Sequence, residues 1–235
     1  MTSARGIFLD RYFCFLMTLL TAAVIVVGFS RTIEQNLIHP AIPRPGLLYL
    51  HAALFTSWLL FFFLQSALVR TGNARIHRTI GWFGVALGTL IPVIGVATTL
   101  TMTRFDLAML NRTNADTDMA IPLWDMIAFT SVFLPAVCFR KKPEIHRRLM
   151  VIATCALTAA GWGRFPERLL PPVAFYSGVD FLILLGVIRD WIVNRKVNAV
   201  YLYVLPFFIA GQSLAMYLVM RKPVVWVNIT HALLG

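Results

Sequence analysis

Seven apolar stretches follow one another along the chain, and short polar segments separate them. A helix that spans a bilayer needs about 20 consecutive apolar residues, and each stretch is close to that length. We therefore predict an all-α membrane protein in which residues 1–235 form a single transmembrane helical-bundle domain. The seven predicted spans lie near 12–29, 47–69, 77–102, 120–139, 146–164, 173–192 and 198–219. The remaining apolar tail, 223–235, is expected at the membrane interface or packed on the bundle.

The composition agrees with a lipid environment. Hydrophobic residues make up 59% of the chain and charged residues only 13%, whereas soluble domains carry about 25% charged residues. A net charge of +11 would suggest nucleic-acid binding in a soluble protein. Here the basic residues lie in short runs between apolar stretches, so we expect the lipid bilayer as partner and no nucleic acid.

The distribution of Lys and Arg predicts the orientation. Of the 21 basic residues, 13 lie on the side of the N-terminus and 8 on the other side. Cytoplasmic loops of membrane proteins are enriched in Lys and Arg. We therefore expect a multi-pass protein whose N-terminus is cytoplasmic and whose C-terminus is outside.

Two segments of the chain are alike beyond composition. His51 is followed by Phe-Thr-Ser at 55–57, and Asp125 is followed by the same three residues at 129–131. The motif Ile-His-Arg then follows in both segments. Its histidine is His77, 26 residues after His51, in the first segment and His146, 21 residues after Asp125, in the second. A fainter third copy would run from Asp180 to Asn198. This pattern predicts one leading helix followed by two or three hairpin repeats that all run in the same direction, unlike the inverted repeats of many transporters.

Ionisable residues within predicted spans form an outer layer. His51, Asp125 and Asp180 each lie about one turn inside the outer end of a span, and Arg164 ends the fifth span on the same side. Such residues are costly in a membrane and are usually functional or paired, and Arg164 is the expected partner of a buried carboxylate. The functional hypotheses are a proton or ion site, or a hard-metal site. The structural alternative is an ion-pair cluster that fixes the helix register.

One face of the second span is also distinctive. Residues 51, 55, 58, 62 and 65 fall at helical spacing, with His51 at one end, Gln65 at the other and aromatic rings between them. This face is expected to point into the bundle, where its side chains either pack against other helices or line a ligand slot.

The inner layer consists of His77 and His146, each followed by an arginine, Arg78 and Arg147. Two histidines on nearby helices can hold a haem iron, and the arginines can pair with haem propionates. The arrangement resembles part of the cytochrome b561 type, in which histidines on a four-helix core hold b haems, and it implies haem b as cofactor. The outer pair departs from that family. Asp125 has the position in the second copy that His51 has in the first, and a carboxylate is a poor haem ligand. At most one haem is expected, and the alternative is a pair of interfacial histidines that bind phosphates or loop carbonyls.

Several motifs are also similar to those of a broad group of uncharacterised predicted bacterial membrane proteins. The resemblance covers roughly residues 47–200. Its residues are His51, Trp58, Gln65, Ile76-His77-Arg78-Thr79-Ile80-Gly81, His146-Arg147-Arg148-Leu149-Met150, Asp180, Arg189 and Asp190. It implies a polytopic protein of the bacterial inner membrane and brings no activity with it.

Three classes of function follow. The leading hypothesis is a b-type haem redox protein with His77 and His146 as ligands. The first alternative is a transporter or ion-conducting protein that uses the outer His, Asp and Arg residues. The second is a non-catalytic subunit or assembly factor of a membrane complex.

Overall fold

The computed structural model describes residues 4–235, with side chains from Asp10 onward. About 82% of the chain is helical, and the described residues contain no strand. Ten α-helices and two short helical turns follow one another: α1 Ala4–Ser30, η1 Glu34–Ile38, α2 Gly46–Arg70, α3 Ala74–Met109, α4 Ala115–Asp118, α5 Ala120–Cys138, α6 Pro143–Ala156, α7 Ala159–Trp162, η2 Pro172–Ala174, α8 Tyr176–Asn194, α9 Ala199–Arg221 and α10 Val224–Leu234.

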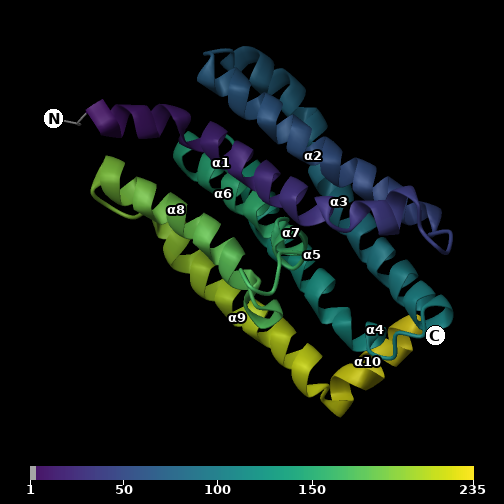
Figure 1. Ribbon diagram of the computed structural model, residues 1–235. Coiled ribbons are helices and arrows are strands. Elements are labelled where there is room, and N and C mark those ends of the chain that lie inside the picture. The colour runs from purple at the N-terminus through teal and green to yellow at the C-terminus, as the bar shows by residue number, and fades with distance from the viewer. Residues whose placement is uncertain (1–3) are drawn as a thin grey trace.

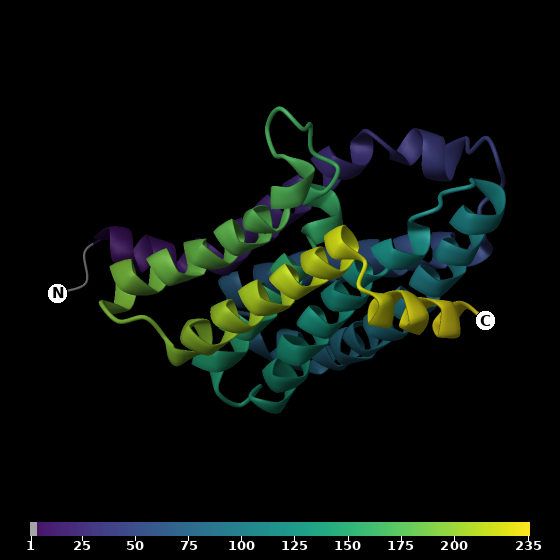
Figure 2. The ribbon, with the colours of Figure 1, turned by 90° about the horizontal axis from the view of Figure 1, so that it is seen from below.

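The long helices run side by side in an elongated bundle (Figure 1). The α5–α6 pair lies between the α2–α3 hairpin and the α8–α9 hairpin, while α1 packs on α2, α6, α7 and α8. The turns 71–73, 139–142 and 195–198 and the start of α1 lie at one end, here called the basic end. The chain finishes at the opposite end, where α10 folds back across α3 and α4 (Figure 2).

Within residues 4–235, six helical segments are long and apolar enough to cross a membrane, which makes the chain a multi-pass membrane protein by length and composition. They correspond to six of the seven predicted stretches. The third is longer than predicted, since α3 continues to Met109. The predicted span ended near residue 102, but the helix is about 54 Å long for its 36 residues, which exceeds the thickness of a bilayer.

The fifth predicted stretch, 146–164, corresponds to two shorter helices, α6 and α7. The helix is interrupted after Ala156 because both the backbone N–H and the hydroxyl of Thr158 donate to the Cys155 carbonyl, at 3.0 and 2.6 Å. This bonding replaces the regular pattern, in which an N–H binds the carbonyl four residues earlier. Neither α6 nor α7 alone is long enough to be counted as a span.

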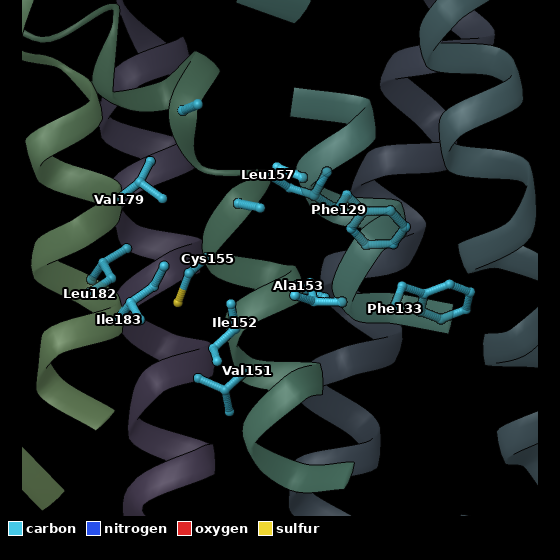
Figure 3. Close-up of a cluster of buried hydrophobic side chains, with 14 of the residues drawn as sticks. Phe129, Phe133, Val151, Ile152, Ala153, Cys155, Leu157, Val179, Leu182 and Ile183 are labelled. Carbon is cyan, nitrogen blue, oxygen red and sulfur yellow. The ribbon is translucent and has the colours of Figure 1, made fainter. Parts of the chain in front are cut away.

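The middle of α6 is the most buried part of the molecule. Residues 151–156 of α6 pack between α5 and α8, and Figure 3 shows Phe129 and Phe133 on one side of them and Leu182 and Ile183 on the other. Small side chains such as Ala153 and Cys155 allow neighbouring backbones to approach closely, and this is how helices associate in membranes.

The contact between α1 and α7 depends on two glycines. A Cβ atom on Gly28 would lie 2.3 Å from the Gly161 carbonyl oxygen. Only a residue without a side chain permits this backbone approach, so the position of α7 against α1 requires Gly28.

Candidate functional site

His77 and His146 lie next to each other at the basic end, although 69 residues separate them in the sequence. Their ring centroids are 6.4 Å apart, and the ring planes meet at 71°. His77 is in the first turn of α3 and His146 in the first turn of α6, and both side chains are half-buried. The two inner-layer histidines therefore lie next to each other on separate helices.

The helix starts place both rings. Pro143 begins α6, and proline suits this position because its fixed φ matches a helix start. Glu144 lies in the first turn of the same helix. Asn73 stands immediately before α3, where its side chain donates to the Thr71 hydroxyl at 3.0 Å and does not cap the helix.

Each histidine ring contacts the helix that precedes its own. The Nδ1 atom of His146 lies 2.8 Å from the Ala136 carbonyl oxygen in α5. A ring nitrogen bonded to a carbonyl carries the proton there, which leaves Nε2 as the free ligand atom. His77 lies beside the backbone of Gln65 in α2, although its buried Nδ1 makes no hydrogen bond. Both side-chain amide atoms of Gln65 are likewise buried without a partner.

The spacing of the two rings suits an ion held linearly between them. Two metal–nitrogen bonds of about 2.0–2.1 Å, with each ring centroid roughly 1.1 Å behind its nitrogen, give a centroid separation of about 6.3 Å. In the described part of the chain, no three His, Cys, Asp or Glu side chains are grouped so as to hold a metal ion. Two imidazoles are the donor set that a b-type haem would need from the protein.

The two arginines that follow the histidines differ in their surroundings. Arg78 is exposed. Arg147 donates to Asp10 at 3.1 Å and to Glu144 at 2.8 Å. Of these two arginines, Arg78 has no carboxylate partner among the described residues. Arg78 is therefore the one that can pair with an anionic group near the rings.

A buried ionic network lies beside this site and was not predicted. Asp190 in α8 is fully buried, and its carboxylate accepts two hydrogen bonds from Arg148 in α6, at 2.8 and 2.7 Å. It also accepts from Arg189 at 2.7 Å and from the backbone N–H of Asn198 at 3.2 Å. Asn198 caps α9 through its side chain, so it is a structural residue here.

The network extends from α8 to the N-terminal helix. Arg189 also donates to Asp10 in α1, and Arg148 donates to both the carboxylate and the backbone carbonyl of Glu144. With Arg147, the network contains three arginines and three carboxylates, so its formal charge is zero. Such pairing is the condition for keeping charges in a buried position. The signal for this network in the sequence was that Arg148, Arg189 and Asp190 all lie inside predicted spans.

The outer-layer residues have separate partners. Asp125 accepts a hydrogen bond from the Tyr176 hydroxyl at 3.0 Å, and Asp180 accepts one from Gln212 at 3.0 Å. His51 stacks on Phe55 with ring centroids 4.0 Å apart. No hydrogen bond or ion pair within residues 10–235 joins any two of His51, Asp125, Arg164 and Asp180.

Arg164 binds elsewhere than we expected. Its guanidinium donates to the Thr32 hydroxyl at 3.2 Å and to the Ala160 carbonyl at 2.5 Å, and it lies 4.1 Å above the Phe29 ring. Burial lowers the pKa of this guanidinium from its usual value. The predicted pairing of Arg164 with Asp125 or Asp180 is therefore wrong, because Arg164 instead fixes the end of α7 to α1 and the segment after it.

The inward face of α2 is confirmed for most of its length. Trp58, Phe62 and Gln65 are buried, while His51 and Phe55 are half-buried. Trp58 donates to the Thr154 hydroxyl of α6 at 3.3 Å. This hydrogen bond connects the α2–α3 hairpin to the centre of the bundle.

The chain matches no family model, no curated protein and no solved structure. The function must therefore be argued from the residues themselves.

Proposed function

We propose that this chain is a seven-crossing protein of the bacterial inner membrane that holds one b-type haem between His77 and His146 and transfers electrons. In this proposal α6 and α7 together make the seventh crossing. They cover 20 residues from Pro143 to Trp162, or about 30 Å of helix, which equals the hydrocarbon thickness of a bilayer. An odd number of crossings agrees with the start of α1 and the C-terminus lying at opposite ends of the bundle (Figures 1 and 2).

The proposed orientation places the basic end in the cytoplasm. The turns 71–73 and 139–142 are flanked by exposed basic residues, among them Arg75, Arg78, Arg140, Lys141 and Lys142. Short loops rich in Lys and Arg are retained on the cytoplasmic side.

The proposed repeat is supported by matching backbone bonds in the first two hairpins. At the end of α2, the N–H groups of residues 71 and 72 donate to the carbonyls of residues 67 and 69, respectively. At the end of α5, the N–H groups of residues 139 and 140 donate in the same way to the carbonyls of residues 135 and 137. In each hairpin the next helix then carries a histidine whose ring returns to the backbone of the helix before it. A repeated hairpin with its histidine at the same place explains why His77 and His146 meet.

The haem proposal is carried by one observation, the adjacent imidazoles of His77 and His146, whose ring centroids lie 6.4 Å apart. When bound, a b-type haem supplies reversible one-electron chemistry. The residues of this chain hold and orient the group: the Ala136 carbonyl fixes the ring of His146, and the adjacent network keeps the start of α6 in place. Arg78 is the residue that would bind a propionate.

Haem content per chain tests this proposal. The protein should be purified from cells supplied with a haem precursor, together with the variants His77→Ala and His146→Ala. Either variant should lose most of the bound haem, because one axial imidazole is removed. The controls are His39→Ala and His51→Ala, which alter histidines outside the pair and should retain it. Loss of haem from neither ligand variant, or from all four variants alike, would contradict the assignment.

The transporter hypothesis has less structural support. It requires His51, Asp125, Asp180 and Arg164 to act together, and each of these has its own separate contacts. The hypothesis of a non-catalytic subunit or assembly factor stays a prediction, to be checked by co-purification of stoichiometric partners.

A further inference from the structure

A cavity opens at the end of the bundle opposite the histidine pair. Its volume is about 590 Å³, and its walls come from α2, α3, α4, α5, η2 and α9. Small-molecule sites have volumes of about 300–1,000 Å³ and are mainly apolar, with a few polar groups that orient the ligand. The volume therefore lies within the range of small-molecule sites.

Four methionines line this cavity: Met102, Met119, Met216 and Met220. Methionine side chains are unbranched and polarisable, so they adapt to ligands of irregular shape. The remaining apolar wall includes Ile121 and Phe175. This lining favours an aliphatic body over a flat or charged one.

Two polar side chains in the lining have no hydrogen-bond partner among the described residues. The Nδ1 atom of His51 and the hydroxyl of Thr98 are both buried without a hydrogen bond. The next residue along α3, Thr99, also lines the cavity, but its hydroxyl donates to the Gly95 carbonyl at 2.9 Å. A buried polar atom without a partner is costly, and a ligand that hydrogen-bonds to His51 and Thr98 would remove that cost.

The charged residues in the lining are already paired with one another. Arg112 donates to Asp106 at 2.9 Å and lies 4.0 Å from Asp118. The cavity therefore offers neither an unpaired cation nor an unpaired carboxylate to attract an ionic ligand.

We propose that this cavity binds an uncharged amphiphile, with its aliphatic chain against the methionines and its hydroxyl or amide group on His51 and Thr98. A hydroxyl group suits both partners because it donates one hydrogen bond and accepts others. The site is separate from the histidine pair, and its role is independent of haem.

A photoreactive diazirine derivative of octanol, with the protein in lipid nanodiscs, tests this proposal. Peptide mass spectrometry should find the label concentrated on cavity residues such as Met102, Met119 and Met216, and excess octanol should compete it away. Thr98→Val should reduce this labelling several-fold because the free hydroxyl is lost. Thr99→Val is the matched control, and it should label like the wild type because its hydroxyl is occupied by Gly95.

Two results would overturn the proposal. One is labelling that is spread evenly over lipid-facing helices and does not respond to competition. The other is equal labelling of the Thr98→Val and Thr99→Val variants. Should Thr98→Val fail to fold, His51→Leu serves as the second variant, and unchanged labelling of that variant would count equally against the site.

Discussion

The buried carboxylate of Asp190 gives the sharpest prediction about stability. It is fully buried, and two guanidinium groups that are each only 4% exposed bind it, those of Arg148 and Arg189. The substitution Asp190→Asn removes the negative charge and leaves both cations buried. Breaking a buried ion pair by removing one partner costs about 3–5 kcal/mol. For a chain of this length, each kcal/mol lowers Tm by about 2–4 °C, so Tm should fall by about 6–20 °C.

The chain contains its own reporter for this measurement. Cys155 is fully buried, Cys14 is partly buried and Cys138 is exposed. In a background with Cys14→Ser and Cys138→Ser, a thiol-reactive fluorophore reports unfolding through Cys155 alone. Tm of the purified protein in detergent is then read from the rise in fluorescence on heating.

A matched control separates burial from pairing. Arg112 and Asp106 form an ion pair in which the arginine side chain is 59% exposed, and exposed pairs contribute about 0–1 kcal/mol. Arg112→Met should therefore shift Tm by less than about 4 °C. The reasoning is refuted if Asp190→Asn lowers Tm no more than Arg112→Met does.

A double variant tests the electrostatic cause. Arg148→Met with Asp190→Leu removes one charge of each sign and fills the space with apolar atoms, and such replacements are often neutral. The double variant should recover at least half of the Tm lost in Asp190→Asn. A double variant less stable than the single one would show that geometry rather than charge balance dominates.

Three further predictions concern the packing and the topology. Gly28→Val should lower the free energy of unfolding by about 1–3 kcal/mol, because the side chain overpacks against Gly161. Gly81→Ala is the control, since a Cβ there would meet nothing within 4 Å, and it should leave Tm unchanged or slightly higher. Tyr176→Phe removes the hydrogen bond to the half-buried Asp125 and should cost about 1–3 kcal/mol. Asp125→Asn keeps an acceptor for Tyr176 and should cost less, so equal Tm values for the two variants would be inconsistent with this account. An alkaline phosphatase fused after the C-terminus should be active in bacteria if the chain crosses seven times as proposed, and an inactive but expressed fusion would argue for an even number.

The sequence was sufficient to predict where most helices lie. Six spans could be located because apolar runs are bounded by charged or turn residues, as at Arg70 and Arg140. The end of α3 could not, since Arg104 lies on a helix that continues beyond the membrane and its side chain binds the carbonyls of Leu233 and Leu234 in α10. That contact depends on tertiary structure, and no local sequence pattern predicts it.

The candidate site could be predicted in part because the motif Ile-His-Arg occurs twice. His77 lies in the first turn of α3 and His146 in the first turn of α6, and the structure places their ring centroids 6.4 Å apart. The partners of Asp190 were not predictable, because they depend on how α1, α6 and α8 are aligned with each other. The failure of the predicted Arg164 pairing has the same cause, since depth in the membrane alone does not place two side chains in contact.

The absorption spectrum of the purified protein tests the central claim most directly. If His77 and His146 together hold one b-type haem, as proposed, the oxidised and reduced spectra of the wild-type protein should be those of a low-spin b haem with two imidazole ligands. Replacing His77 alone should convert any haem that remains to a five-coordinate, high-spin form. A wild-type protein that shows no Soret band when haem is supplied in culture, or a high-spin spectrum that His77→Ala leaves unchanged, would contradict the account.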